Sequence, residues 1–257
     1  PRAMIREQLE ALADELGYKG GFQVVIRVPG GREMAQRTFN PNLGIENGIS
    51  ILGTSGIVEP MSSQALIDTI HLEIRQGLAG GDRRLILTPG NYGTDFLAGG
   101  TLCFPEYIQI VKCSNFIGEA LDCAVLEGAS QLLLVGHIGK FVKLAGGIFN
   151  THSRWADGRV EIFCAHAAVC GADQNTARLL MDSPTTDSCL EILDRAHLRE
   201  EVLHSLLTAI QRHLDRRVGH SVQTGAVLFS NQYGLLGSTP GAEEIMKQWN
   251  IQTPTDL

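Results

Sequence analysis

The sequence predicts an α/β fold in which a mostly parallel sheet is covered by helices on both faces. From residue 49 onward, short apolar runs alternate with longer runs whose apolar residues recur at helical spacing. This alternation is typical of parallel sheets, because parallel neighbours are joined by crossover helices. Polar and glycine-rich residues follow several of the apolar runs, as they do at the ligand-binding ends of strands in such sheets. We therefore expect a three-layer α/β/α domain.

The individual elements follow from length and periodicity. Strands are predicted where short apolar runs are bounded by turn-forming residues, at 49–52, 84–88, 107–112, 131–135, 160–164 and 226–230. Helices are predicted between most of them, at 63–78, 116–127 and 198–217. The resulting order of strand, turn and helix is Rossmann-like.

The first 48 residues have a different organisation. Residues 5–16 show helical spacing, and residues 22–28 read as a strand followed by a Pro-Gly-Gly turn. One helix and one strand cannot cover both faces of a sheet. We therefore expect residues 1–48 to be the C-terminal remnant of a smaller α+β domain, with residues 49–257 forming the three-layer domain.

Composition limits the class of protein. The 257 residues are 44% hydrophobic and 19% charged, with a formal net charge of −7, which suits a globular chain with a substantial core. An acidic chain predicts no nucleic-acid partner unless a local basic patch exists. The six cysteines show no CxxC spacing, so a reduced, cytoplasmic setting is expected. No apolar run approaches the roughly 20 residues of a membrane-spanning helix, so no membrane partner is expected.

Three segments that follow predicted strands have the composition of cofactor-binding loops. Glycines let the backbone approach a ligand closely, and a carboxylate just beyond a strand can receive ribose hydroxyls. The candidate cofactor-binding residues are Gly53, Thr54, Gly56, Glu59, Pro89, Gly90, Asn91, Gly93, Ser114 and Asn115. The GxGxxG fingerprint is absent, so plain tight turns remain an alternative, and Ser114 fits a helix N-cap equally well.

The segment from Cys113 to Arg159 contains the densest group of candidate residues for chemistry. Its cations exceed its nearby acids, and such an excess in an acidic protein suits a polycarboxylated or phosphorylated substrate. The candidate substrate-binding residues are Lys140, Lys143, Asn150, Arg154 and Arg159. The candidate catalytic residues, which would manage a proton, are His137, His152 and Asp157. Lysines that face solvent on a helix are the alternative reading.

Other chemistries have less support. Cys164, His166 and Cys170 are of metal-binding types, but a fourth ligand is not evident, so no protein-bound metal is expected. Cys113 precedes a predicted helix, whose N-terminus would lower a thiol pKa, yet no GxSxG motif or defined partner histidine accompanies it. The missing GxxxxGK[ST] loop excludes P-loop phosphoryl transfer.

Five runs together resemble the CbiD family of cobalt-precorrin-5B C1-methyltransferases. They are RTFNPNLGIENGISILGTSGIVEPMS, LILTPGNYG, CSNFIGEALDCAV, LLLVGHIGKFVKLAGGIFNTHSRWADGR and TGAVLFSNQYGLLG. The resemblance extends, in order, over nearly the whole chain. It implies methyl transfer from S-adenosylmethionine to ring carbon C1 of a cobalt-corrin precursor, in the anaerobic route to cobalamin. Members of the family also carry a further N-terminal region, which agrees with the expectation for residues 1–48.

The resemblance and the residues agree on substrate chemistry. A corrin precursor is a tetrapyrrole with several carboxylate side chains, so it needs local cations in an otherwise acidic protein. A non-catalytic corrinoid- or nucleotide-binding module remains the alternative. A hydrolase-like or dehydrogenase enzyme is disfavoured by the missing fingerprints. The sequence leaves open which crevice holds the methyl donor and whether the chain forms a homo-oligomer.

Overall fold

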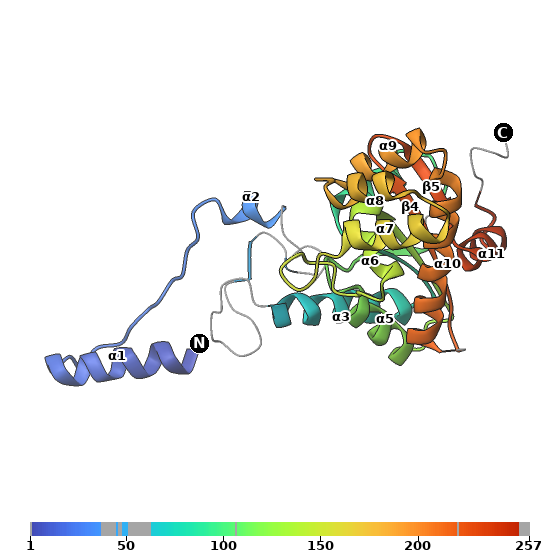
Figure 1. Ribbon diagram of the computed structural model, residues 1–257. Helices are drawn as coiled ribbons and strands as arrows, with labels where there is room; N and C mark the ends of the chain where they lie inside the picture. Colours follow the sequence, from blue (N-terminus) through green and yellow to red (C-terminus); the bar gives the residue numbers. More distant parts are fainter. Residues whose placement is uncertain are drawn as a thin grey trace. The chain divides into compact units, whose positions relative to one another are not determined.

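Figure 1 shows the computed structural model of the chain, which describes residues 2–36, 45, 48–50, 63–105, 107–219 and 221–251. Internal contacts divide the chain into two compact units, Pro1–Ala65 and Leu66–Leu257. The domain boundary expected after residue 48 stays a prediction. No helix within the described ranges is both long enough and apolar enough to cross a bilayer.

The first unit contains α1 (Arg2–Leu16) and the short α2 (Gly31–Ala35). The helix predicted at 5–16 is therefore confirmed. The strand predicted at 22–28 is wrong, because these residues form no regular secondary structure. Phe22 and Val25 in this segment are exposed. A strand needs a hydrogen-bonding neighbour, and the described residues provide none for this segment.

The second unit is built around a five-stranded sheet with the order β2-β1-β3-β4-β5. Its strands are β1 (Arg84–Thr88), β2 (Gln109–Lys112), β3 (Gln131–His137), β4 (Gln223–Ser230) and β5 (Gly234–Ser238). The first four are mutually parallel, and β5 pairs with β4 in the antiparallel direction after a register shift near Leu228 and Phe229. The predicted mostly parallel α/β sheet is confirmed.

Helices cover both faces of this sheet. They are α3 (Ser63–Ala79), α4 (Asn91–Ala98), α5 (Ile117–Leu126), α6 (Ile138–Ala145), α10 (Arg199–Val218) and α11 (Pro240–Gln248). Helices α7 (Arg159–Val169), α8 (Gln174–Met181) and α9 (Thr186–Arg195) form a group that packs on α6 and α10. Alternate residues of β3 point to opposite faces, as strand geometry requires. Leu132 and Leu134 join the larger core with helices α3, α5, α6, α7 and α10. Leu133 and Val135 join the smaller core with α4 and α11.

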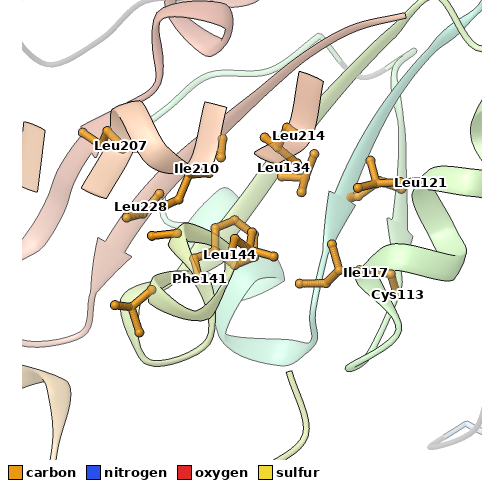
Figure 2. Packing of buried hydrophobic residues seen from close by; sticks show 14 of the residues in the cluster. Cys113, Ile117, Leu121, Leu134, Phe141, Leu144, Leu207, Ile210, Leu214 and Leu228 are labelled. Carbon is orange, nitrogen blue, oxygen red and sulfur yellow. The ribbon is translucent and has the colours of Figure 1, made fainter. Parts of the chain in front are cut away.

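Figure 2 shows part of the larger core, where Phe141 and Leu144 of α6 meet Leu214 of α10 and strand residues Leu134 and Leu228. All five are buried. Because α6 begins directly at the end of β3, this packing also determines where the first residues of α6 lie.

Most predicted elements of this unit agree with the structure. The strand at 84–88 and the helices at 63–78, 116–127 and 198–217 are confirmed to within one residue at either end. The strands at 107–112, 131–135 and 226–230 are confirmed with boundaries shifted by two or three residues. Of the strand predicted at 49–52, residues 51 and 52 lie outside the described residues, and 49 and 50 have no regular structure.

The strand predicted at 160–164 is wrong, because these residues belong to α7. A short apolar run fits a strand and a buried helix equally well, so periodicity over five residues does not separate them. Phe163 and Ala167, four residues apart, are both buried, which is the spacing of one helix face.

Helix α11 lies in backbone contact with β4. A Cβ atom added to Gly225 would lie 2.1 Å from the backbone nitrogen of Ala242 and 2.3 Å from its Cα. Only glycine therefore fits at this position of β4 while α11 keeps its place.

We expect Gly225→Ala to lower the free energy of unfolding by about 1–3 kcal/mol, because α11 must shift to admit the methyl group. Gly80→Ala is the matched control, since nothing lies within 4 Å of the added atom there. The control should stay within about 0.5 kcal/mol of the parent. Urea unfolding followed by circular dichroism measures both. Equal stability of the two variants would contradict the close packing.

Candidate functional site

A cavity of about 720 Å³ lies at the carboxyl ends of β1 and β3. Its walls are residues 89–93 after β1, His137, Gly139 and Lys140 after β3, Arg159 at the start of α7, and 185–187 at the start of α9. We call it the switch-point cavity. In a sheet with the order β2-β1-β3, the chain leaves β1 and β3 toward opposite sides, and ligands bind in the crevice between them. Its volume is in the range of small-molecule sites.

The loop after β1 brings backbone close to this cavity. Gly90 has φ 155° and ψ −160°, a conformation that side chains rarely adopt. A Cβ atom on Gly93 would lie 1.7 Å from Thr88 Oγ1 and 3.1 Å from the carbonyl oxygen of Val135. The start of α4 can therefore pack against β1 and β3 only with glycine at position 93.

His137 is the last residue of β3 and the N-cap of α6. Its Nδ1 atom accepts a hydrogen bond of 3.0 Å from the backbone N–H of Gly139. The neutral ring therefore carries its proton on Nε2. Burial lowers the pKa of His137, and the Asp187 carboxylate opposes that shift. At neutral pH His137 thus offers the cavity an Nε2–H donor.

Lys140 ties the two strand-end loops together. Its ammonium donates a hydrogen bond of 3.3 Å to the carbonyl oxygen of Pro89. Burial lowers the pKa of Lys140 from its usual value. Burial of the Cys113 thiol raises its own pKa to about 12. This shift disfavours the thiolate that the alternative of a Cys113 nucleophile requires.

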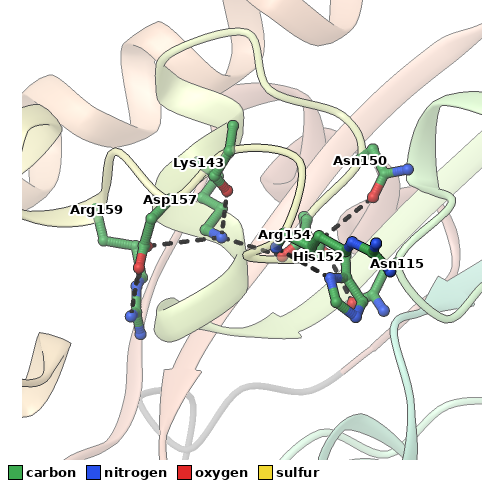
Figure 3. Close-up of polar contacts among 9 residues, drawn as sticks. Asn115, Lys143, Asn150, His152, Arg154, Asp157 and Arg159 are labelled. Atoms are coloured by element: carbon green, nitrogen blue, oxygen red, sulfur yellow. Dashed lines mark hydrogen bonds and ion pairs between the residues drawn. The ribbon is translucent and has the colours of Figure 1, made fainter.

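A second network lies between α6 and the start of α7 (Figure 3). Arg159 donates to Asp157 through Nε at 2.5 Å and Nη2 at 2.9 Å, and this guanidinium lowers the pKa of Asp157. Lys143 lies 3.7 Å from Asp157 and donates to the carbonyl oxygens of Thr151 at 3.1 Å and Ala156 at 2.8 Å. Lys143 is buried, so its ammonium holds this loop in place.

The rest of the polar cluster consists of short local contacts. Thr151 Oγ1 donates to Asn115 Oδ1 at 3.2 Å. Asn150 Oδ1 accepts from the backbone N–H of His152, whose Nδ1 in turn accepts from the backbone N–H of Arg154. These contacts shape the loop and leave the Arg154 side chain exposed.

The structure brings some of the predicted site residues together and separates others. Those that line the switch-point cavity are Pro89, Gly90, Asn91, Gly93, His137, Lys140 and Arg159. Those that do not line it are Ser114, Asn115, Lys143, Asn150, His152, Arg154 and Asp157. Asp157 and Arg159 both line an adjoining cavity of about 230 Å³. Gly53, Thr54, Gly56 and Glu59 lie outside the described residues.

Tyr92, Gly139 and residues 185–187 also line the cavity, although the sequence assigned them no binding role. Thr185 is the N-cap of α9 and accepts from the backbone N–H of Ser188 at 3.1 Å, a helix-start signal visible in the sequence. Asp187 Oδ1 accepts a hydrogen bond of 2.7 Å from Ser230 Oγ at the end of β4. No spacing rule connects this segment to β1 or β3, since only the folded chain brings them together.

The residues of metal-binding type have other partners. Cys164 Sγ donates to the carbonyl oxygen of Ala177 at 3.7 Å, and His166 Nδ1 lies 2.7 Å from Ser205 Oγ. Among the residues that the structure describes, no group of three or more His, Cys, Asp or Glu side chains is arranged to hold a metal ion.

An open, mostly parallel sheet with a cavity at its switch point defines a protein of the doubly wound α/β class. Two family models match the chain: "CbiD" over residues 1–60 and "CbiD, C-terminal domain" over residues 150–240. The chain belongs to the CbiD family. No solved structure matches it.

Several curated relatives carry the name cobalt-precorrin-5B C(1)-methyltransferase. The protein from Ruminiclostridium cellulolyticum is 47% identical over 253 residues, which are 96% of this chain and 65% of that protein. The protein from Alkaliphilus metalliredigens is 37% identical over 96% of this chain and 64% of its own length. That from Methanobrevibacter smithii is 41% identical over 84% and 59%. The chain thus spans just under two thirds of the first two relatives.

We expect Lys143→Met to lower the free energy of unfolding by about 1.5–3 kcal/mol, because the variant keeps the packing but loses charged hydrogen bonds to two carbonyls. Lys247→Met, at an exposed position of α11, is the control and should change stability by less than about 0.5 kcal/mol. Urea unfolding at neutral pH measures both. A Lys143→Met variant as stable as the control would show that the loop does not depend on this ammonium.

The lowered pKa of His137 predicts that the stability of the fold depends on pH. Because its folded pKa is lowered, the unfolded chain takes up the proton first as the pH falls through about 6.5, and the folded state loses stability there. His137→Asn keeps an acceptor for the Gly139 N–H and does not titrate. We expect the difference in unfolding free energy, wild type minus variant, to shrink between pH 8 and pH 5. Parallel curves for the two proteins would contradict the lowered pKa.

Proposed function

We propose that this chain is part of a methyltransferase that uses S-adenosylmethionine to methylate C1 of cobalt-precorrin-5B in anaerobic cobalamin biosynthesis, in the cytoplasm. The observation that carries the proposal is the 47% identity, over 96% of this chain, to a relative of that name. The region aligned with this relative includes residues of both compact units. The cavity described above supports the same conclusion by its position and size.

We place the methyl donor in the switch-point cavity. Two observations support the fit. Gly90 lines the cavity, and nothing lies within 4 Å of a Cβ atom placed on it, so a ligand can approach the backbone there. The exposed Tyr92 ring at the wall, centred 6.1 Å from the His137 ring, is suited to stack on a purine. When bound, the donor supplies an electrophilic methyl group on a sulfonium.

The residues of the chain would then act by binding and alignment. Methyl transfer needs the reacting carbon held in line with the leaving sulfur, and orientation supplies much of the rate. His137 Nε2–H and the Lys140 ammonium are donors for polar groups of the ligands. We assign Arg154, whose side chain is exposed, to a carboxylate of the larger corrin acceptor.

We expect the wild-type chain to bind S-adenosylhomocysteine, the product of the donor, in isothermal titration calorimetry. Tyr92→Ala should weaken that binding by about 1–3 kcal/mol, the scale of stacking between a base and an aromatic ring. Tyr107→Ala is the matched control, because Tyr107 is equally exposed (64% against 66%) but packs over Arg84 away from the cavity. Equal affinities of the two variants would exclude Tyr92 from the site.

Turnover separates the enzyme from a corrinoid- or nucleotide-binding module without activity. The chain is incubated with methyl-labelled S-adenosylmethionine and cobalt-precorrin-5B, and label in the corrin is measured. Label at C1 supports the proposed reaction. Binding of both ligands with no transfer, while a relative of full length transfers the label under the same conditions, supports the binding module.

A further inference from the structure

We infer that one end of the switch-point cavity binds a zwitterionic α-amino acid group, with Arg159 holding its carboxylate and Asp187 its ammonium. The inference rests on the proposed function, in which the methyl donor carries such a group. It assigns roles to a pair of side chains that come from the starts of two different helices, α7 and α9.

Two side chains of opposite charge line the same cavity. Arg159 and Asp187 both line it together with Thr185 and Thr186. Arg159, Thr185 and Thr186 also line the adjoining cavity, so the guanidinium lies beside the beginning of α9. An inorganic anion at this end would be repelled by Asp187, and a simple amine would be repelled by Arg159. A group that carries both charges satisfies both residues.

Asp187 is held in place from behind the cavity. Ser230 Oγ accepts hydrogen bonds from the backbone N–H groups of Gln232 at 3.0 Å and Tyr233 at 3.3 Å. Its two lone pairs are then used, so its hydroxyl proton points to Asp187 Oδ1, 2.7 Å away. Ser230 is buried, which fixes this arrangement. Oδ1 is thus anchored by Ser230, while within the described chain Oδ2 has no recorded hydrogen bond.

Arg159 is oriented in a similar way. Its Nε and Nη2 atoms bind the two oxygens of Asp157, which also lies within 3.7 Å of the buried Lys143. Nη1 makes no hydrogen bond to another described residue, which leaves that edge of the guanidinium for a ligand carboxylate. Both side chains are held before a ligand arrives, which lowers the entropy cost of binding.

The test compares two nucleosides that differ only at the amino acid end. S-adenosylhomocysteine carries the zwitterion, and 5′-methylthioadenosine lacks it. We expect Asp187→Asn to weaken the binding of S-adenosylhomocysteine by about 10- to 100-fold, the range for a charged hydrogen bond. The affinity for 5′-methylthioadenosine should stay within about twofold of the wild-type value. Asp182→Asn, at an exposed aspartate of the same region, is the control and should change neither affinity.

Ser230→Ala provides a second variant, which frees Asp187 without removing its charge. We expect Ser230→Ala to weaken the binding of S-adenosylhomocysteine less than Asp187→Asn does, and to leave the binding of 5′-methylthioadenosine unchanged. Retained binding of 5′-methylthioadenosine shows that the cavity of each variant is folded.

Three results would overturn the inference. Equal losses for both nucleosides in Asp187→Asn would place Asp187 against the ribose or the base, or reveal a folding defect. Equal wild-type affinities for the two nucleosides would show that the amino acid end is not recognised. A wild-type chain that binds neither nucleoside would contradict the proposed donor site itself, and that outcome is distinct from the first two.

Discussion

The pairing of β3 with a parallel neighbour on each side is the constraint on which the rest of the structure depends. Leu133 of β3 pairs in register with Ile86 of β1 and with Gly225 of β4, and all the strand's inner side chains are buried. Each fully buried leucine contributes about 1.5–3 kcal/mol relative to an exposed one. Because β3 ends at His137, its position determines where the N-terminus of α6, the Lys140 side chain and one wall of the cavity lie.

The cations around the site are used mainly to hold backbone in place. Lys140 and Lys143 donate to the main-chain carbonyls of Pro89, Thr151 and Ala156. Burial lowers the pKa of both lysines, because a desolvated ammonium is less stable than a hydrated one. Hydrogen bonds to carbonyls compensate part of that cost. The loop after β1 and the loop before α7 are thereby joined to a single helix, α6.

Much of the sheet could be predicted from the sequence, because residues 84–88 and 131–135 are apolar runs bounded by turn residues, and buried parallel strands have this pattern. About half of the residues that line the cavity could also be predicted from the sequence, because residues such as Gly90 and His137 stand directly at strand ends. The rest depends on tertiary structure. Asp187 reaches the cavity only because α9 packs onto α6 and α7. Lys143 is buried and donates to backbone carbonyls, and the charge of a lysine in the sequence does not indicate that it will be buried.

The glycine-containing strand β5 determines how the sheet ends. It runs against β4, its pairing is interrupted by a register shift at Leu228 and Phe229, and Gly234 and Gly237 have positive φ values. A short, irregular outer strand is a poor template for a further strand, because its free N–H and C=O groups are out of step with a regular ladder. On this side, the sheet is protected against growth by strand addition from another copy, and so against the first step of edge-to-edge aggregation.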